Sequence, residues 1–363
     1  MWYQKLQSVL VEIGFQCVKV DSSIYVFKKD KVHIILPVFV DDITLASNSL
    51  EAIQSIIQQL SSHFRLRDLG PTSFLLGIQI TRDRPNRTIS LCQRQYILDI
   101  LERFSMRDCK PVLTPMQLGL RLSASMSPKT PEEVVAMKDI PYVSAVGALL
   151  YLATATRPDI SHTVSVLCRF NNNPGMEHWK AVKHLLRYLK GTVDMKLTYS
   201  PSPSRSNEPF TTYTDADHGG DPDNSRSTSG YLLCIGTGAV SWSSKLQSLV
   251  ALSTTEAEFI AAVEAGKEML WMRNLLQELG FPVSGSSTFL IDNQSALAVA
   301  KNPEHHGRMK HLDMRFFWLR DAVENGTLTP VYVGTEDQAA DILTKSLCAQ
   351  KIGKCRGLMG LRQ

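Results

Sequence analysis

The sequence has 363 residues, of which 44% are hydrophobic and 20% are charged. This length and composition allow two or three globular domains and exclude a chain that is disordered throughout. Residues 1–204 contain 24 basic and 17 acidic residues (net +7), residues 205–349 contain 11 and 18 (net −7), and residues 350–363 add +4. A basic first part suits contact with phosphates and an acidic second part suits metal cations. Ordinary variation between two protein surfaces explains the asymmetry equally well.

Neither a membrane span nor a secretory signal is expected. The longest charge-free apolar stretch, Val143 to Thr156, falls short of the roughly 20 apolar residues that span a bilayer. The first segment, MWYQKLQSVLVEIGF, contains Glu12 and lacks the continuous apolar core of a signal peptide. The seven cysteines form no CxxC pair and have no histidine at zinc-finger spacing. We therefore expect an intracellular protein with reduced thiols and no zinc site.

The first elements in chain order are strands and amphipathic helices. The run VHIILPVFV from Val32 is a buried-strand pattern, and Asp41-Asp42 interrupt it before ITLA, which predicts a hairpin with two carboxylates near its tip. AIQSIIQQLSSHF has apolar residues at helical spacing. FLLGIQITRDRPNRTISLCQ indicates two strands joined by a polar turn at Arg84 to Arg87, and YILDILERF indicates another helix.

The middle of the chain is predicted to be mainly helical. Residues between Cys109 and Pro141 are rich in Pro, Ser, Met and Thr, which is typical of a linker or an extended crossing. Residues 141–190 are largely helical, and HWKAVKHLLRYLKG is expected to end at Gly191 as its C-cap. This last helix carries basic residues at three- and four-residue steps, which predicts a stripe that follows a phosphate backbone or, as an equal alternative, a solvated face: Lys180, Lys183, Arg187 and Lys190. A second linker is expected from Ser200 to Pro209.

The acidic part of the sequence alternates strands with helices. The expected elements are a strand at 211–214, a hairpin with Gly236 and Gly238 near its turn, a helix from Ser253 to Leu279, a strand at 287–291, a short helix, a helix from about Asp313 to Asn325, the strand LTPVYV and a last helix from about Asp337. Three antiparallel strands, a helix, and then strand, helix and strand predict an α/β layer with a mixed sheet.

Four carboxylates stand at strand ends and helix starts in this part. Asp215 follows its first strand, Asp292 follows its fourth, Glu258 lies in the first turns of the long helix, and Asp341 lies near the start of the last one. Reactive groups of open α/β sheets gather at such places. Carboxylate oxygens are the ligands that Mg²⁺ prefers, and two ions at one site can promote phosphodiester cleavage. The set therefore predicts a two-metal site.

Each of these acidic residues has an alternative role as a turn or cap residue. Ser253 to Glu256 fits a capping box, so Glu256 is assigned to the helix cap and Glu258 to the metal. In the loop DADHGGDPD, Asp217, Asp221 and Asp223 are interpreted as solvated turn residues.

Long motifs resemble the ribonuclease H domain of copia-type retrotransposon polyproteins. They are TDADHGGDPDNSRSTSGYLLCIGTGAVSWSSKLQSLVALSTTEAEFIAA, IDNQSALAVAKNP, KHLDMRFFWLRDAV and VGTEDQAADILTK. The resemblance implies cleavage of the RNA strand of RNA/DNA hybrids with two Mg²⁺ ions, or Mn²⁺ in their place. It implies a catalytic and metal-binding set at Asp215, Glu258, Asp292 and Asp341, and Arg226 is added as a nucleic-acid-binding candidate. The sequence departs from the family pattern at two places. His218 replaces the aromatic residue that is usual in the family. The bacterial enzymes place a histidine in the loop before the last Asp, and the corresponding stretch Val331 to Ala340 contains none.

Other motifs resemble the polymerase of the same family. FVDDI, at residues 39–43, is similar to the catalytic hairpin of reverse transcriptases, and DLGPTSFLLGIQI, CKPVLTPM and YVSAVGALLYLATATRPDIS resemble its flanking parts. The two-metal polymerase site needs a further Asp on an upstream strand. Glu12, Asp21 and Asp30 do not match it, so Asp41 and Asp42 are interpreted as a vestigial site, and we expect no DNA synthesis by this chain alone.

The resulting expectation is a multidomain protein of the α/β and α+β classes. Its predicted parts are a truncated reverse-transcriptase palm and thumb (1–115), a helical connection (116–204), a ribonuclease H-like domain (205–349) and a basic tail (350–363). The expected partners are the RNA/DNA hybrid and the missing polymerase portion, and the expected location is the cytoplasm, in a virus-like particle, or the nucleus. A non-catalytic nucleic-acid-binding remnant is the main alternative. Another nuclease or an integrase on the same fold is a third, which the order Asp-Glu-Asp-Asp disfavours.

Overall fold

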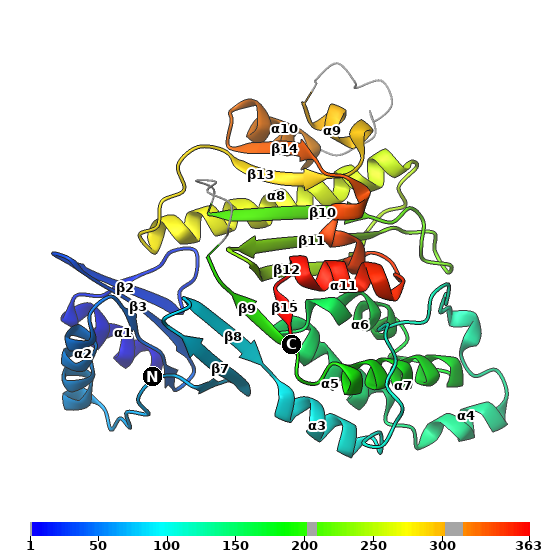
Figure 1. Ribbon diagram of the computed structural model, residues 1–363, viewed down its shortest axis with the longest axis horizontal. Helices are drawn as coiled ribbons and strands as arrows, with labels where there is room; N and C mark the ends of the chain where they lie inside the picture. Colours follow the sequence, from blue (N-terminus) through cyan, green and yellow to red (C-terminus); the bar gives the residue numbers. More distant parts are fainter. Residues whose placement is uncertain (1, 202–208, 302–314) are drawn as a thin grey trace. The chain divides into compact units, whose positions relative to one another are not determined.

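The computed structural model of the protein describes residues 2–201, 209–301 and 315–363. The chain forms two compact units (Figure 1): Met1–Ser73 with Glu268–Ser284, and Phe74–Lys267 with Gly285–Gln363. These units differ from the predicted divisions at 115, 204 and 349. The difference arises because segments far apart in the sequence share sheets and cores.

The first unit is a small α/β layer. Its sheet has the order β1-β2-β3-β4, with β5 paired to β3, and the helices α1 and α2 precede and follow it. The core includes Leu10, Tyr25 and Ile34, none of which is exposed. The predicted hairpin and the predicted helix after it are confirmed. Their bounds are α1 Trp2–Ile13, β1 Gln16–Cys17, β2 Ile24–Lys29, β3 Val32–Phe39, β4 Asp42–Ile43, β5 Ala46–Ser47 and α2 Leu50–His63.

The second unit contains a helical part with its own hydrophobic core. Leu149, Leu185 and Leu186 are fully buried there, and burying a leucine side chain contributes about 1.5–3 kcal/mol each. The α7 helix includes Gly191 as its last residue, so the predicted C-cap is off by one position and Thr192 is the C-cap. The helices are α3 Arg94–Arg103, α4 Pro131–Lys138, α5 Tyr142–Ala155, α6 Ser161–Cys168 and α7 Met176–Gly191.

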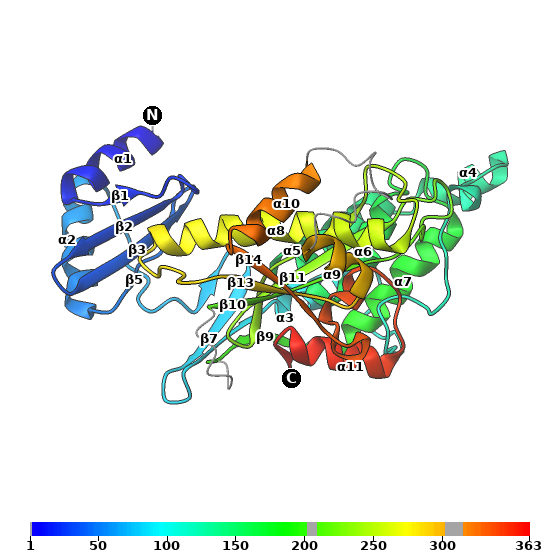
Figure 2. The ribbon, with the colours of Figure 1, turned by 90° about the horizontal axis from the view of Figure 1, so that it is seen from above.

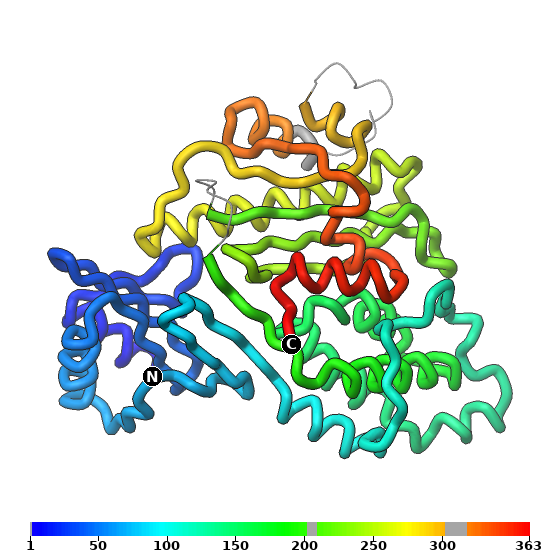
Figure 3. Tube along the Cα trace, in the orientation of Figure 1, coloured from blue at the N-terminus to red at the C-terminus, as the bar shows by residue number. Residues whose placement is uncertain are grey.

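A second sheet of this unit joins segments that are distant in the sequence. Its order is β15-β9-β8-β7-β6, so the predicted hairpin around Arg84 to Arg87 pairs through β9 with the end of the chain. The Cα trace shows the C-terminal segment running beside this sheet (Figure 3). The strands are β6 Phe74–Leu75, β7 Ile78–Asp83, β8 Thr88–Cys92, β9 Lys196–Tyr199 and β15 Leu361–Arg362.

The third sheet is the predicted mixed sheet. Its order is β12-β11-β10-β13-β14, with antiparallel pairing among β10, β11 and β12 and parallel pairing of β13 with both β10 and β14. The part of the long helix α8 that belongs to this unit, up to Lys267, lies along one face, and α11 lies on the other (Figures 1 and 2). The strands and helices are β10 Phe210–Ala216, β11 Thr228–Ile235, β12 Gly238–Leu246, α8 Thr254–Glu278, β13 Ser287–Ile291, α9 Gln294–Lys301, α10 Arg315–Glu324, β14 Leu328–Tyr332 and α11 Ala349–Leu358.

The prediction of a last helix from about Asp337 was wrong. Two short 3₁₀ turns, Thr335–Asp337 and Ala339–Leu343, occupy this stretch, and the last α-helix, α11, begins only at Ala349. Residues 350–363, expected to be a basic tail, instead form most of this helix and the strand β15. Ile352 and Cys355 are buried in the core behind the mixed sheet, which explains why the segment is ordered.

Two expectations concern segments that are only partly described. The predicted linker from Ser200 to Pro209 and the start of the predicted helix at Asp313 lie largely outside the described residues. None of the described helices is by itself long and apolar enough to cross a membrane; α4 and α5 pass that test of length and composition only together, as a pair bent by 53°.

Candidate metal centre

The mixed sheet brings Asp215 and Asp292 together through strand register. In the parallel pair of β10 and β13, Tyr213 lies opposite Leu290. Asp215 and Asp292 each come two residues after this pair, so their side chains point to the same side of the sheet. Neighbouring strands are about 4.8 Å apart, which brings the two carboxylates close together. The sequence placed Asp215 after its strand, whereas the structure places it within β10.

Helix α8 adds Glu258 to these two aspartates. Ser253 caps the helix, because its Oγ accepts a hydrogen bond from the Glu256 backbone N–H at 3.2 Å. Ala257 is fully buried against the end of β10, which holds the first turns of α8 against the sheet. One carboxylate oxygen from each of Asp215, Glu258 and Asp292 lies within 4.8 Å of the other two. Among the described residues, this is the group with the composition and spacing of a metal site.

The electrostatics of the cluster favour a cation. Asp215 and Glu258 are only 1% and 7% exposed. Burial and the nearby Asp215 and Asp292 carboxylates raise the pKa of Glu258 to about 9, and burial, opposed in part by Lys345, raises the pKa of Asp215 to about 7. Glu258 Oε2 is buried without a hydrogen-bond partner among the described residues. A buried carboxylate oxygen without a partner is costly, so the donor set fits a divalent cation.

The fourth carboxylate, Asp341, differs from the other three because two lysines pair with it. It lies on the second 3₁₀ turn, is 2% exposed and is paired with two lysines. Lys345 Nζ lies 2.7 Å from Asp341 Oδ1 and 3.5 Å from Asp215 Oδ2, and Lys351 Nζ lies 3.2 Å from Asp341 Oδ2. Thr344 Oγ1 also donates a hydrogen bond to Asp215 Oδ2. The structure therefore brings all four predicted carboxylates to one region, with Asp341 joined to the cluster through Lys345.

Sequence reasoning missed both lysines. Lys345 stands four residues after Asp341, which is the spacing of an ion pair across one helical turn, and that signal was visible in the sequence. Lys351 comes from α11, and its approach to Asp341 depends on how this helix packs on the sheet. No local pattern indicates that contact.

Comparisons with known proteins extend over the whole chain. Residues 1–118 match the family model for reverse transcriptase (RNA-dependent DNA polymerase). The chain is 43% identical, over 99% of its length, to the retrovirus-related Pol polyprotein from transposon TNT 1-94 of Nicotiana tabacum. The chain belongs to the copia-type retrotransposon Pol polyprotein family.

Other relatives agree with this membership. The Pol polyprotein from transposon RE1 of Arabidopsis thaliana is 37% identical over 98% of the chain. A putative transposon Ty5-1 protein of Saccharomyces cerevisiae is 33% identical, and the match covers 74% of this chain and 84% of that protein. The chain spans only 27% of the tobacco polyprotein and 24% of the RE1 polyprotein.

Solved structures match as well, and one of them is a ribonuclease H domain. The N-terminal ribonuclease H domain of a Mycobacterium tuberculosis protein, fused to maltose-binding protein, aligns with 40% of this chain and 94% of its own chain, at 10% identity and a TM-score of 0.27. This similarity is too low to support a conclusion about the Pol chain.

Two of the three loop acidic residues of this Pol chain are not the solvated turn residues that were predicted, whereas Asp223 is an exposed turn residue. Asp221 is 4% exposed and pairs with Arg169 Nη1 at 2.9 Å, and Asp217 accepts a hydrogen bond from the Thr228 backbone N–H. Asp223 accepts hydrogen bonds from Ser123 Oγ at 2.6 Å and from the Ala124 backbone N–H at 2.8 Å. The prediction failed for Asp221 because its partner Arg169 comes from another part of the chain, which sequence patterns do not place beside the loop.

The polymerase aspartates belong to the first compact unit, whereas the residues of the metal centre belong to the second. Asp41 and Asp42 are both exposed, and Asp42 pairs with Phe39 across the β3–β4 hairpin. They belong to no group of three metal-ligating side chains within the part of the chain that the structure describes. Their interpretation as a vestigial polymerase site stays a prediction.

The predicted basic stripe runs along α7, but its members differ in their contacts. Lys180 is exposed and pairs with Glu177 at 2.6 Å, whereas Arg187 Nε donates a hydrogen bond to the Lys110 carbonyl at 2.7 Å. Lys183, Lys190 and the separate candidate Arg226 are half-buried. Arg187 thus has a structural contact, and binding of nucleic acid by all five residues stays a prediction.

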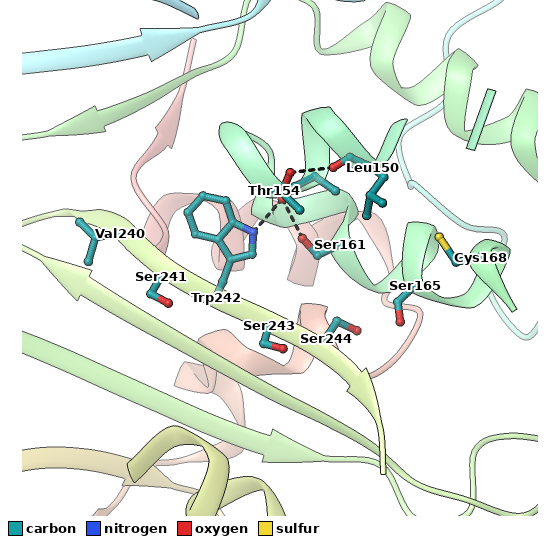
Figure 4. A pocket seen from close by; sticks show the side chains of 11 residues that line it. Leu150, Thr154, Ser161, Ser165, Cys168, Val240, Ser241, Trp242, Ser243 and Ser244 are labelled. Atoms are coloured by element: carbon teal, nitrogen blue, oxygen red, sulfur yellow. Dashed lines mark hydrogen bonds between the residues drawn. The ribbon is translucent and has the colours of Figure 1, made fainter. Parts of the chain in front are cut away.

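A cavity of about 430 Å³ lies between α5, α6 and β12 (Figure 4). Trp242 lines it and donates a hydrogen bond from Nε1 to the Ala153 carbonyl at 2.7 Å, and Ser161 Oγ donates to the same carbonyl at 3.2 Å. Its lining residues are serines, one threonine, one cysteine and apolar side chains, and they include none of the four carboxylates. The cavity is therefore separate from the metal centre.

The two glutamates at the start of α8 give a direct test of the assignment. Replacing Glu256 by Gln is expected to keep metal binding and lower the free energy of unfolding by only about 1 kcal/mol, because Glu256 Oε2 accepts a hydrogen bond from the Leu252 backbone N–H at 2.8 Å and acts as a cap. Glu258→Gln is expected to abolish metal binding. Mn²⁺ binding and thermal unfolding of both variants check this, and the reverse result would mean that Glu256 is the ligand.

Proposed function

We propose that the chain cleaves the RNA strand of RNA/DNA hybrids in a reaction that depends on Mg²⁺, with Mn²⁺ as a substitute. The observation that carries the proposal is the convergence of Asp215, Glu258 and Asp292, from two strands and a helix, with oxygens within 4.8 Å of one another. Membership of the Pol polyprotein family supports a role on nucleic acid. The hybrid itself is suggested by the motifs that resemble ribonuclease H.

In this proposal Asp215, Glu258 and Asp292 hold the cations. Bound divalent ions would supply an activated water and stabilise the charge that develops on the phosphodiester oxygens. Thr344 orients Asp215 through its hydroxyl hydrogen bond. Burial of the cluster keeps bulk water away from the carboxylates, which strengthens their interaction with a cation. Asp341, the fourth predicted ligand, is held nearby by Lys345.

The test uses the purified full chain with a labelled RNA/DNA hybrid. We expect cleavage of the RNA strand with Mg²⁺ or Mn²⁺ and none with EDTA, and no cleavage of the DNA strand. Single-stranded RNA and duplex DNA of the same sequence serve as substrate controls. Binding of the hybrid without cleavage in either metal would contradict the proposal and favour the non-catalytic nucleic-acid-binding remnant.

The basic stripe on α7 is expected to contribute to substrate binding. Replacing Lys180 and Lys183 together by Gln should weaken hybrid affinity and reduce the slope of log affinity against log salt, by roughly 0.7–0.9 for each phosphate group that the protein no longer neutralises. Lys129 and Lys138, which flank or end α4, provide a double Gln variant that removes the same charge elsewhere. If both double variants have the slope of the unmodified chain, the stripe is not a phosphate-binding surface.

A further inference from the structure

An ammonium group lies among the carboxylates of the proposed metal centre. Lys345 Nζ is 2.7 Å from Asp341 Oδ1 and 3.5 Å from Asp215 Oδ2, so one lysine contacts two of the four carboxylates. The Lys345 side chain is 41% exposed, whereas those of Asp341 and Asp215 are 3% and 1% exposed. The lysine thus approaches the buried carboxylates from the solvent side.

The local backbone fixes this approach. The backbone N–H groups of Thr344 and Lys345 both donate to the Asp341 carbonyl, at 3.2 and 3.1 Å, which closes one helical turn. The turn puts Lys345 on the same side as Asp341 and lets the Thr344 hydroxyl reach Asp215. A single five-residue segment therefore supplies a carboxylate, a hydroxyl and an ammonium to the same place.

Counting formal charges shows what the lysines do to the site. The four carboxylates carry −4 when ionised, and Lys345 and Lys351 bring +2, which leaves −2. One divalent cation neutralises this charge. A second one would leave an excess of +2, which is unfavourable in a poorly solvated site unless an anion such as a substrate phosphate arrives with it.

We propose that Lys345 occupies the edge between Asp215 and Asp341 as a resident cation, so that the free protein binds one divalent ion tightly and a second one only weakly. The inference rests on the proposed metal-dependent function and adds an order of ion binding to it. Lysine suits this role because its flexible stem and compact charge let the ammonium move from the carboxylates to a phosphate. Lys345 is then a positioning residue that couples the second ion to the presence of substrate.

The test measures Mn²⁺ binding to the full chain without nucleic acid, by the loss of the free-ion paramagnetic resonance signal. The unmodified chain is expected to bind one ion tightly. Lys345→Met is expected to bind a second ion at least about tenfold more tightly than the unmodified chain does, a difference of about 1.4 kcal/mol. Lys345→Arg, which keeps the charge, should behave like the unmodified chain.

Lys354→Met is the matched control. Lys354 pairs with Asp337 Oδ1 at 2.9 Å and is 43% exposed, so this variant removes the same charge from a similarly exposed lysine that contacts none of the four carboxylates. Equal second-ion affinities in Lys345→Met and Lys354→Met would overturn the inference while leaving the metal site intact. If neither the unmodified chain nor any of the variants binds Mn²⁺, the proposed function is contradicted as well.

Stability is measured in parallel, because loss of Lys345 increases the repulsion among the carboxylates. Lys345→Met is expected to unfold at a lower temperature than Lys354→Met in EDTA and to regain most of the difference when Mn²⁺ is added. If Lys345→Met does not fold, Lys345→Gln replaces it in the same titration. A loss of stability that Mn²⁺ does not restore would show a purely structural role for Lys345.

Discussion

Replacing Asp292 or Asp215 by Asn is expected to lower the rate of hybrid cleavage by on the order of 10³-fold or more, while the protein stays folded. Each change removes one charge from the three-carboxylate cluster, and the transition-state stabilisation that a bound ion supplies amounts to several kcal/mol. Losing one charge also relieves repulsion in the buried cluster, so the metal-free variants should be at least as stable as the unmodified chain.

Cleavage rates and thermal unfolding in EDTA check this expectation. Asp337→Asn is the control, because Asp337 is a surface carboxylate of the same unit that pairs with Lys354 and is 65% exposed. It should keep full activity. Near-normal cleavage by both Asp215→Asn and Asp292→Asn would remove the basis for the metal centre.

The largest effect on stability is expected from a buried ion pair far from the carboxylate cluster in the sequence. Arg157 Nη2 lies 2.8 Å from Asp159 Oδ2, and their side chains are 1% and 0% exposed. Tyr188 also donates a hydrogen bond to Asp159 at 2.6 Å, and Thr192 accepts two from Arg157, through its carbonyl at 3.2 Å and its Oγ1 at 2.7 Å. Burial would raise the pKa of Asp159, but Arg157 and Tyr188 hold it below its usual value.

Asp159→Asn should therefore lower the free energy of unfolding by about 3–5 kcal/mol, because it leaves the Arg157 charge buried without a counter-ion. Asp194→Asn is the comparison. Asp194 forms an ion pair with Arg94 at the same 2.8 Å distance, but the Asp194 side chain is 67% exposed and the Arg94 side chain is 51% exposed. Removing that pair should cost no more than about 1 kcal/mol. Denaturant unfolding of the two variants measures the difference, and similar losses in both would mean that the buried pair is not uniquely important.

Local sequence patterns determined much of the mixed sheet and of the site. The strand at 287–291 was predicted with its observed bounds, and the hairpin around Gly236 and Gly238 is also present. Alternation of apolar residues and turn signals act over a few residues, so they can be read without knowing the rest of the fold. Ser253 and Glu256 likewise formed the expected cap, and Glu256 Oε2 accepts a hydrogen bond from the Leu252 N–H.

Long-range pairing was decided only by the tertiary structure. Leu91 of β8 pairs with Leu197 of β9, which in turn pairs with Leu361 of β15, and no local pattern specifies partners so far apart. This pairing brings segments from three of the predicted parts of the chain into one compact unit. The 3₁₀ turns around Asp341 also escaped prediction, because the sequence does not show that the apolar stretch Ala339–Leu343 forms a short turn rather than an α-helix.

The candidate site shows the same division. The sequence by itself determined which carboxylates stand at strand ends and helix starts, since Asp215, Glu258 and Asp292 follow from strand and helix positions. Only the tertiary structure decided that Lys351 reaches Asp341 and that Arg169 neutralises Asp221. Charges attract their partners through space rather than along the chain, so the packing of α11 and α6 against the sheet determines which pairs form.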